Sequence, residues 1–281
     1  MRPPNHATPG VLLLILAIVL PVLYYIWLAR RKKDLYVRRL AGVDAIDEAC
    51  GRSAELGRPM AFTTGLTAVG PILYACLGVV YYVARKAAMY KSKFFYPQND
   101  PEVLPIAEDI VREAYKAEGK VAAFDPGSVS YLSNEQFAFA AGYMGLVQRE
   151  EIASAFLMGR FAAESLLLAE AGQQMGAMQI AASVSPEQVA FFICTCDYTL
   201  IGEELYAASA YLTREPVQLG SLYGQDRTKL LFFVIIIIGV AIATLHSLYP
   251  DAALFQSNVD SWIVMEYGEW AKLLGFSGEG S

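Results

Sequence analysis

The sequence predicts a doubly wound α/β domain, a mostly parallel sheet in three layers, flanked by transmembrane helices. Three observations predict this fold class. Between residues 154 and 204, short apolar runs alternate with helical patterns, and glycine, serine and aspartate fall where one pattern changes to the next. Helical connections between short apolar strands indicate a parallel sheet that is covered on both faces. Long apolar stretches near both ends add the membrane helices, and 55% apolar with 18% charged residues suits such a mixed protein.

An N-terminal transmembrane anchor is expected within residues 1–29. Residues 11–28 form an apolar stretch long enough to span a bilayer, and aromatic residues close it before a basic run that begins at Arg30. A cleaved signal peptide is disfavoured, because the positive charge is concentrated after the stretch and no A-x-A site follows it.

A second transmembrane helix is expected over residues 230–248, which carry no charged side chain. Residues 249–281 then form an amphipathic C-terminal tail, which lies on the outer membrane surface or docks on another subunit. With two crossings, residues 30–229 become a cytoplasmic α/β domain of a multi-pass protein of the cell membrane. Of the 22 lysines and arginines, only Arg2 and Lys272 lie outside this domain, as the positive-inside bias requires.

The apolar stretch 67–84 has two interpretations. Its length suits a third membrane helix, but we expect a buried helix of the α/β domain. Pro71 stands where a first helical turn tolerates proline, and short apolar runs at 59–63 and 93–96 precede and follow the stretch like strands. A third crossing would also move the basic residues from Arg85 to Lys93 outside, against the charge bias.

The remaining elements follow an α/β order along the domain. Serine followed three residues later by glutamine predicts capping boxes at Ser133 and Ser185. Asp197 or Thr199 is expected to cap the last helix, and residues 186–196, which follow the second capping box, fit either a helix or a strand. The expected strands are 61–64, 93–96, 129–132, 154–158 and 179–183, and the expected helices are 43–56, 67–84, 100–118, 133–151, 160–171 and 199–211.

Four phrases carry a family resemblance: EQFAFAAG, MGRFAAESLLLAEAG, AMQIAAS and CDYTLIGEELYAASAYLTREP. With them, the segment from about Ala45 to Lys229 resembles an uncharacterised family of prokaryotic membrane-anchored proteins, a domain of unknown function. The resemblance implies the fold and the membrane location, and it implies no activity, substrate, cofactor or catalytic residue.

Ligands of open α/β sheets bind beyond the carboxyl ends of the strands, at a switch in strand order. Helix N-termini there favour anions, and Arg160 directly after a strand could clamp a phosphate or carboxylate. The sequence lacks the G-x-G-x-x-G and P-loop motifs, and helix capping by itself explains the serines, threonines and aspartates. The candidate ligand-binding residues are Thr64, Gly65, Ser133, Arg160, Glu164, Ser185, Asp197 and Glu203.

Glu164 interrupts an apolar helical pattern, and a buried carboxylate needs a partner. It could pair with Arg160 four residues earlier, or join Asp197 and Glu203 around Mg²⁺ or Ca²⁺. We expect no metal site, because the acids are scattered and the two histidines lie near the membrane segments. The four cysteines, two of them in C-x-C, are expected to be free thiols of a reducing compartment.

The sequence favours a membrane-anchored module with a scaffold, assembly or small-ligand-sensing role. The alternative is an enzyme that acts on a phosphorylated or nucleotide-like substrate at the strand ends. No catalytic residue and no cofactor can be assigned, and Ser–His or Cys–His catalysis is excluded when both histidines lie outside the cytoplasmic domain. The net charge of −6 argues against nucleic acid. The expected partners are the lipid bilayer and further copies of the chain or a membrane protein complex.

Overall fold

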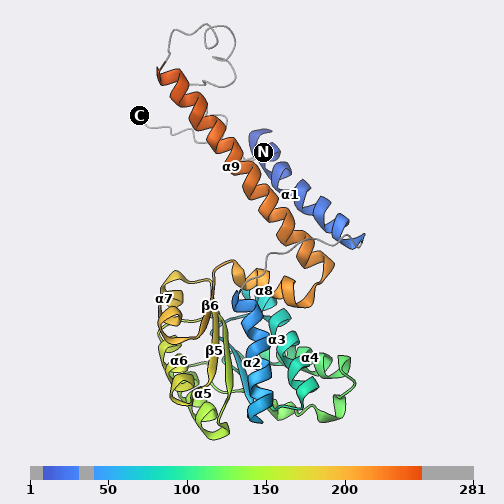
Figure 1. Cartoon of the computed structure of the whole chain (residues 1–281), viewed down its shortest axis with the longest axis vertical. Coiled ribbons are helices and arrows are strands. Elements are labelled where there is room, and N and C mark those ends of the chain that lie inside the picture. Colours follow the sequence, from blue (N-terminus) through green and yellow to red (C-terminus); the bar gives the residue numbers. More distant parts are fainter. Residues whose placement is uncertain (1–8, 32–40, 249–281) are drawn as a thin grey trace, which may run out of the picture. The chain divides into compact units, whose positions relative to one another are not determined.

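Two units make up the protein in the computed structural model, which describes residues 9–31 and 41–248 (Figure 1). The larger unit, Tyr36–Glu215, is an α/β domain. The smaller unit combines the segments Met1–Leu35 and Pro216–Ser281, and its described part is a pair of helices.

The α/β unit is built on one six-stranded sheet in which every described strand pair is parallel. The strand order is β3-β2-β1-β4-β5-β6, so the chain winds outward from β1 in one direction and from β4 in the other. This order confirms the predicted α/β fold with a parallel sheet. The strands are β1 Met60–Gly65, β2 Phe94–Gln98, β3 Val129–Tyr131, β4 Ser154–Arg160, β5 Met178–Ser183 and β6 Tyr198–Ile201.

Helices cover both faces of the sheet and complete three layers (Figure 1). One face carries α2 Ala41–Leu56, α3 Pro71–Tyr90, α4 Val103–Ala117 and α8 Glu204–Thr213. The other face carries α5 Gln136–Glu150, α6 Glu164–Gln174 and α7 Pro186–Thr195. Two short 3-10 helices, η1 Val121–Ala123 and η2 Pro126–Ser128, lead from α4 into β3.

The alternation of side chains along the strands fills two separate cores. In β4, Phe156 and Met158 point into the core beneath α3, whereas Ala155 and Leu157 point into the core beneath α5 and α6. Phe156 stacks on Phe62 of β1 with ring centroids 6.0 Å apart. Each fully buried side chain of this size contributes about 2 kcal/mol of burial free energy, so the two cores hold the sheet between its helices.

The apolar stretch at 67–84 lies in the α/β core, as expected. From Pro71 on it belongs to α3, which runs to Tyr90, contributes ten buried residues and packs between α4 and α8, while residues 67–70 lie in the loop before the helix. Among the described residues, α3 is the one helix long and apolar enough to cross a membrane, and 56% of its apolar window is buried. Burial on this scale is the property of a core helix rather than of a helix surrounded by lipid.

Three local predictions were wrong. Residues 198–201 form strand β6 rather than a helical turn, because their backbone pairs with β5 from Ile180 to Ser183. Neither capping box forms: α5 starts at Gln136 with Glu135 at its N-cap, and Ser185 precedes α7 without a side-chain cap bond. The Ser133 hydroxyl instead stabilises a loop turn, since Ser133 Oγ accepts from Glu135 N at 3.1 Å.

The smaller unit pairs α1 Pro9–Arg30 with α9 Pro216–Leu248 in antiparallel directions. Two glycines bring the helix axes together: a Cβ at Gly220 would lie 2.6 Å from Ile26 Cα, and one at Gly224 would lie 2.7 Å from Val22 Cα. The predicted span 230–248 is the second part of the single 33-residue helix α9. The basic run after Arg31 and the predicted tail 249–281 lie outside the described residues.

Candidate functional site

The strand order reverses between β1 and β4, so the carboxyl ends of these two strands mark the position where sheets of this topology bind ligands. Thr64 and Gly65 end β1, and Arg160 ends β4. Glu164 opens α6 immediately after β4. Four of the predicted site residues are therefore brought to the switch point by the fold.

Hydrogen bonds join the loop after β1 to the end of β4 and close the switch point between these strands. Leu66 N donates to Arg160 O at 2.8 Å, and Arg160 N donates to Thr67 Oγ1 at 2.7 Å. Thr67 Oγ1 in turn donates to Thr64 O at 2.5 Å. Gly159 permits this approach, because its φ of +149° suits glycine and a Cβ there would lie 2.4 Å from Thr64 O.

The loop from β1 to α3 shows why a dinucleotide does not fit here as in other doubly wound sheets. Gly65 and Gly70 stand at the first and last positions of a six-residue G-x-x-x-x-G segment, but Thr67 occupies the middle position where the fingerprint needs glycine. Gly65, with φ +57°, is covered by the Phe161 ring, which lies 2.5 Å from where its Cβ would be. A phosphate therefore cannot approach the backbone of Gly65 from the side that Phe161 covers.

Glu164 is fully buried at this edge. Its carboxylate accepts from Gln136 Nε2 at 2.5 Å and from Ala162 N at 3.0 Å. The expected pairing with Arg160 does not form, because Arg160 belongs to β4 and not to the helix. The exposed Arg160 side chain has no hydrogen-bond or ion-pair partner in the described part of the chain.

A buried polar group lies beside the switch point. Thr64 Oγ1 donates to Gln98 Oε1 at 3.0 Å, and both side chains are buried. The Gln98 amide nitrogen and the Tyr96 hydroxyl, also buried, lack partners among the described residues. Burial raises the pKa of Tyr96, so its hydroxyl stays protonated at neutral pH.

The other predicted residues are spread over the fold. Ser133 follows β3, Ser185 follows β5 and Glu203 follows β6, each at the carboxyl edge but after a different strand. Asp197 was placed wrongly, because it precedes β6 at the amino edge, where Oδ2 accepts from Gln179 N at 2.7 Å. It therefore cannot share an ion with Glu164. Within the described ranges, no three His, Cys, Asp or Glu side chains are grouped to hold a metal ion.

The free thiols differ in exposure. Cys50 and Cys76 are buried, Cys194 is exposed and Cys196 is partly exposed. Burial, reinforced by the charge of Asp47, raises the pKa of Cys50 to about 12, and burial alone raises the pKa of Cys76. Both buried thiols are thus unreactive at neutral pH, as a structural role requires.

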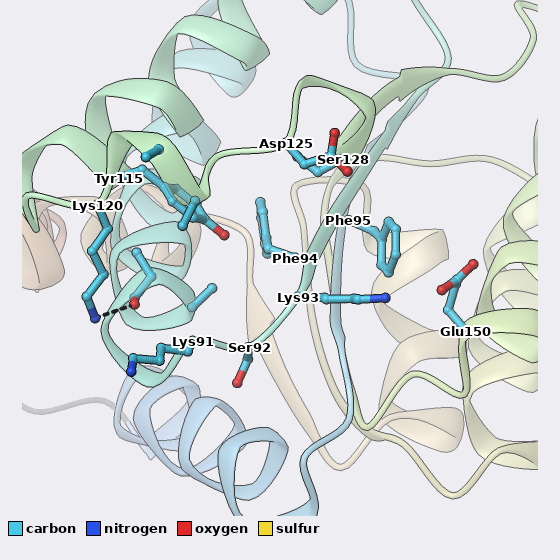
Figure 2. A pocket seen from close by; sticks show the side chains of 14 residues that line it. Lys91, Ser92, Lys93, Phe94, Phe95, Tyr115, Lys120, Asp125, Ser128 and Glu150 are labelled. Atoms are coloured by element: carbon cyan, nitrogen blue, oxygen red, sulfur yellow. Dashed lines mark hydrogen bonds between the residues drawn. The ribbon is translucent and has the colours of Figure 1, made fainter.

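A cavity of about 810 Å³ lies at the opposite, amino edge of the sheet (Figure 2). It lies at the start of β2, between the C-terminal turn of α3 and the loop that follows α4. Sequence reasoning missed it, because the lining residues are spread from Ala87 to Glu150 and share no motif. The residues that give it chemical character are Lys91, Lys93, Phe94, Tyr115, Lys120 and Asp125.

The fold and these sites define a doubly wound parallel α/β protein with a closed switch point and an added pair of apolar helices. The chain matches the family model of the domain of unknown function DUF6754 over residues 5–254, and it belongs to that family. Comparison with curated proteins and with solved structures gave no match. The match confirms the predicted domain of unknown function, and it carries no activity and no information on prokaryotic origin or membrane anchoring.

Proposed function

We propose that the protein is a membrane-anchored α/β module, held in the bilayer by α1 and α9. The observation that carries this proposal is the exposed apolar surface of the helix pair. Contiguous apolar surface of this extent is rare on water-facing proteins and marks a membrane or partner surface. The exposed side chains are Ile15, Leu16, Ile18, Val19, Leu20, Leu23, Tyr24 and Trp27 on α1, and Leu230, Leu231, Phe233, Val234, Ile235, Ile236, Ile237, Ile238 and Val240 on α9.

The packing between the two helices also suits lipid. Gly220 and Gly224 form a G-x-x-x-G spacing, and Thr228 continues it at the next turn with its hydroxyl donating to Gly224 O at 2.9 Å. Small residues at this spacing let membrane helices associate by close backbone contact, where water supplies no hydrophobic driving force.

Aromatic and basic side chains mark the end of the pair that leaves the bilayer. Tyr25 and Tyr223 meet edge to face, with ring centroids 5.0 Å apart. The Arg31 guanidinium lies 3.7 Å from the centroid of the Trp27 ring. Amphipathic rings and cations of this kind favour the headgroup region.

The apolar stretches of the two helices are staggered. Since Ile26 faces Gly220 and Val22 faces Gly224, the same register brings Leu230 level with about Leu16. The exposed charges Asp226, Arg227 and Lys229 then lie beside the apolar middle of α1. We place the inner boundary of the bilayer at the level of Tyr25 and Tyr223, and the long Arg227 side chain reaches this level, since its guanidinium donates to Tyr223 Oη at 2.8 Å.

With this boundary, the α/β unit lies on the cytoplasmic side of the cell membrane, and its role is to sense a ligand or to organise copies of the chain or a membrane complex. The alternative enzyme has less support. Its substrate would need the switch point, which the bonds from Thr67 and Leu66 to neighbouring loops occupy. The exposed Arg160 remains the residue there that could meet an anion.

Extraction of isolated membranes with sodium carbonate tests the anchor. The full chain is expected to stay in the membrane pellet after the wash, and a chain with Ile236→Lys and Ile238→Lys is expected to be extracted in part, because each lysine costs about 3 kcal/mol near the bilayer centre. Leu56→Lys is the matched control, since Leu56 is an exposed apolar residue of the α/β unit. Release of the unaltered chain by the wash would refute the anchor.

A further inference from the structure

We propose that the amino-edge cavity of the α/β unit binds a small organic anion with an aromatic or apolar body. The cavity volume of about 810 Å³ falls in the range of pockets that enclose a drug-sized molecule. The site is separate from the switch point between β1 and β4. It belongs entirely to the α/β unit, so the inference does not depend on the membrane anchor.

The inner walls of the cavity are apolar. Phe94 at the start of β2 and Ala87 and Ala88 at the end of α3 line it, and all three are buried members of the core. Ala122 and Ala123 of η1 form part of its rim. Phe94 and Ala88 are each only 2% exposed, so they close the floor of the cavity, and the apolar lining favours a ligand with a ring or a hydrocarbon body.

Tyr115 supplies a hydrogen-bond donor in the wall of the cavity. The residue is only 7% exposed, and its ring packs edge to face against Phe124 with centroids 5.8 Å apart. The hydroxyl points from the wall toward Phe94, as Figure 2 shows, and it has no hydrogen-bond partner among the described residues. Burial and the charge of Asp125 raise the pKa of Tyr115, so the hydroxyl carries its proton and can donate to a ligand oxygen.

The charges at the cavity mouth favour an anion. Lys91 and Lys93 have no ion-pair partner in the part of the chain that the structure describes. Both acids of the lining already accept a donor: Asp125 Oδ1 accepts from Gly127 N at 2.9 Å, and Glu150 Oε1 accepts from Arg149 Nε at 2.9 Å. Only Glu150 has a cationic partner, since the N–H group that Asp125 accepts from is neutral. With three lysines and two carboxylates the lining still has an excess of positive charge, which favours an anion.

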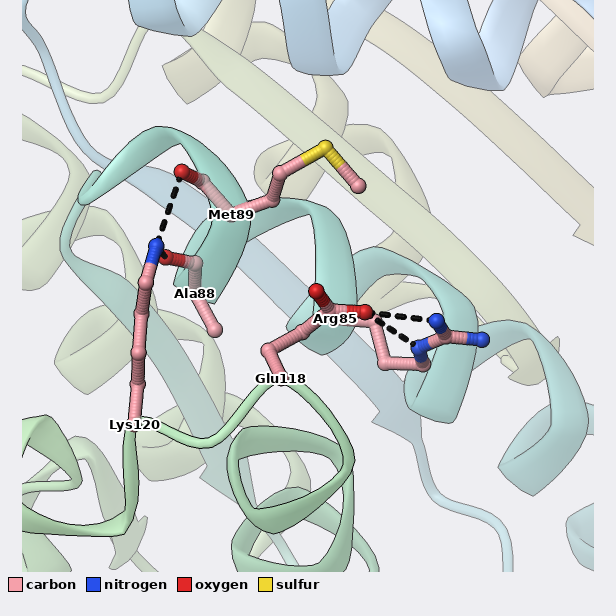
Figure 3. A network of polar contacts seen from close by, with 5 residues as sticks. All are labelled: Arg85, Ala88, Met89, Glu118 and Lys120. Atoms are coloured by element: carbon pink, nitrogen blue, oxygen red, sulfur yellow. Dashed lines mark hydrogen bonds and ion pairs between the residues drawn. The ribbon is translucent and has the colours of Figure 1, made fainter.

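The third lysine fixes the wall. Lys120 Nζ donates to Ala88 O at 2.8 Å and to Met89 O at 3.1 Å, and it thereby binds the loop after α4 to the end of α3 (Figure 3). Beside it, Arg85 pairs with Glu118 at 2.5 Å. These bonds hold both sides of the cavity in place before any ligand enters, so binding needs little ordering of the protein.

Equilibrium dialysis of the full chain in detergent micelles against 2-naphthoate tests the inference, with protein-free micelles as the blank. The probe has an aromatic body and a carboxylate. We expect saturable binding above the blank, and binding of the uncharged 2-naphthamide weaker by about tenfold, because the amide loses the attraction of the two lysines.

Four variants locate the binding. The double variant Lys91→Gln, Lys93→Gln should weaken 2-naphthoate by about tenfold, and Tyr115→Phe by about fivefold, a loss of about 1 kcal/mol that suits one hydrogen bond. Ala122→Trp, at an exposed rim position, should abolish binding by filling the cavity. Lys116→Gln is the matched control, because Lys116 is exposed on α4 and does not line the cavity.

Circular dichroism is used to check that each variant is folded. The lysine substitutions are expected to leave the fold intact, because both lysines are exposed and do not pack in the core. The inference is overturned if 2-naphthoate shows no saturable binding above the micelle blank. It is also overturned if the amide binds equally well, or if the double lysine variant and Ala122→Trp bind like the unaltered chain. A chain that proves soluble would refute the anchor, and the same dialysis without detergent would still test the cavity.

Discussion

Helices α3 and α9 look alike in sequence and meet opposite surroundings. Both are long and apolar, yet α3 buries ten side chains between α4 and α8, whereas the second part of α9 exposes Phe233, Ile236 and Val240 by more than 60% of their surface. The difference lies in what each helix packs against. Hydropathy measures how strongly a segment avoids water, and it does not say whether the protein's own core, as for α3, or lipid, as we propose for α9, takes the place of water.

The largest expected difference between α3 and α9 is in how the stability of the α/β unit responds when a lysine is introduced into each helix. Val80 of α3 is fully buried, so Val80→Lys is expected to prevent folding of the α/β unit, because an uncompensated buried charge costs several kcal/mol out of a total stability of roughly 5–15 kcal/mol. Ile236→Lys in α9 is expected to leave the thermal midpoint of that unit unchanged. Thermal unfolding followed by circular dichroism measures both, and a folded Val80→Lys chain would contradict the core assignment of α3.

The next comparison concerns the glycines at which each helix packs closely against its neighbour. A Cβ at Gly78 of α3 would lie 2.0 Å from Ser209 Oγ of α8. We expect Gly78→Ala to destabilise the α/β unit by about 2 kcal/mol in denaturant unfolding, because the packed helices must separate. Adding Ser209→Gly should recover most of this loss. Without such recovery, the contact between α3 and α8 is not the cause.

In the helix pair, Gly224→Leu is expected to separate α9 from α1 at a cost of about 1–2 kcal/mol of pairing free energy. Cross-linking of Tyr25→Cys to Tyr223→Cys by a short bismaleimide reports the pairing, since the tyrosine rings at these positions lie 5.0 Å apart and the reagent bridges the remaining gap between two cysteines. The Gly224→Leu chain should form this cross-link more slowly. Gly239→Leu is the control, because a Cβ at Gly239 meets nothing within 4 Å. Equal rates in all three chains would exclude this packing.

The smallest expected effect is on the stability of the α/β unit at alkaline pH. The pKa of Cys50 rises from 9.0 to about 12 on folding, so the folded unit keeps a proton that the unfolded chain releases. The stabilisation is complete below pH 9 and is lost as the pH rises toward 12, by at most about 1.4 kcal/mol per pH unit for this thiol. Cys50→Ala should reduce the slope of unfolding free energy against pH over this range, and an unchanged slope would contradict the assignment.

The sequence predicted the fold best where the pattern was local. The stretch 154–183 alternates between strand and helix patterns, and β4, α6 and β5 appear there as expected. Strand β6 was missed, because Tyr198–Ile201 is short and resembles a capped helical turn. Its extended form depends on pairing with β5, a contact that no local pattern records.

The candidate site was predictable in position and not in detail. Thr64 and Gly65 end β1, Arg160 ends β4 and Glu164 lies just after β4, at the predicted position, since the carboxyl ends of parallel strands lie at one edge of the sheet. The hydrogen-bond partner of Glu164 is Gln136, which lies 28 residues away in the sequence, and no sequence pattern predicts this contact. The amino-edge cavity depends on three separate segments and was invisible for the same reason.

The bonds that join the loops after β1 and β4 affect more than ligand access. These strands are where the two windings of the sheet meet, and Leu66, Thr67 and Arg160 tie them together beyond the last paired residues. The half of the sheet formed by β1, β2 and β3 therefore cannot move away from the half formed by β4, β5 and β6 without breaking these hydrogen bonds. The α/β unit should accordingly lose its structure in one cooperative transition, with both windings melting at the same temperature.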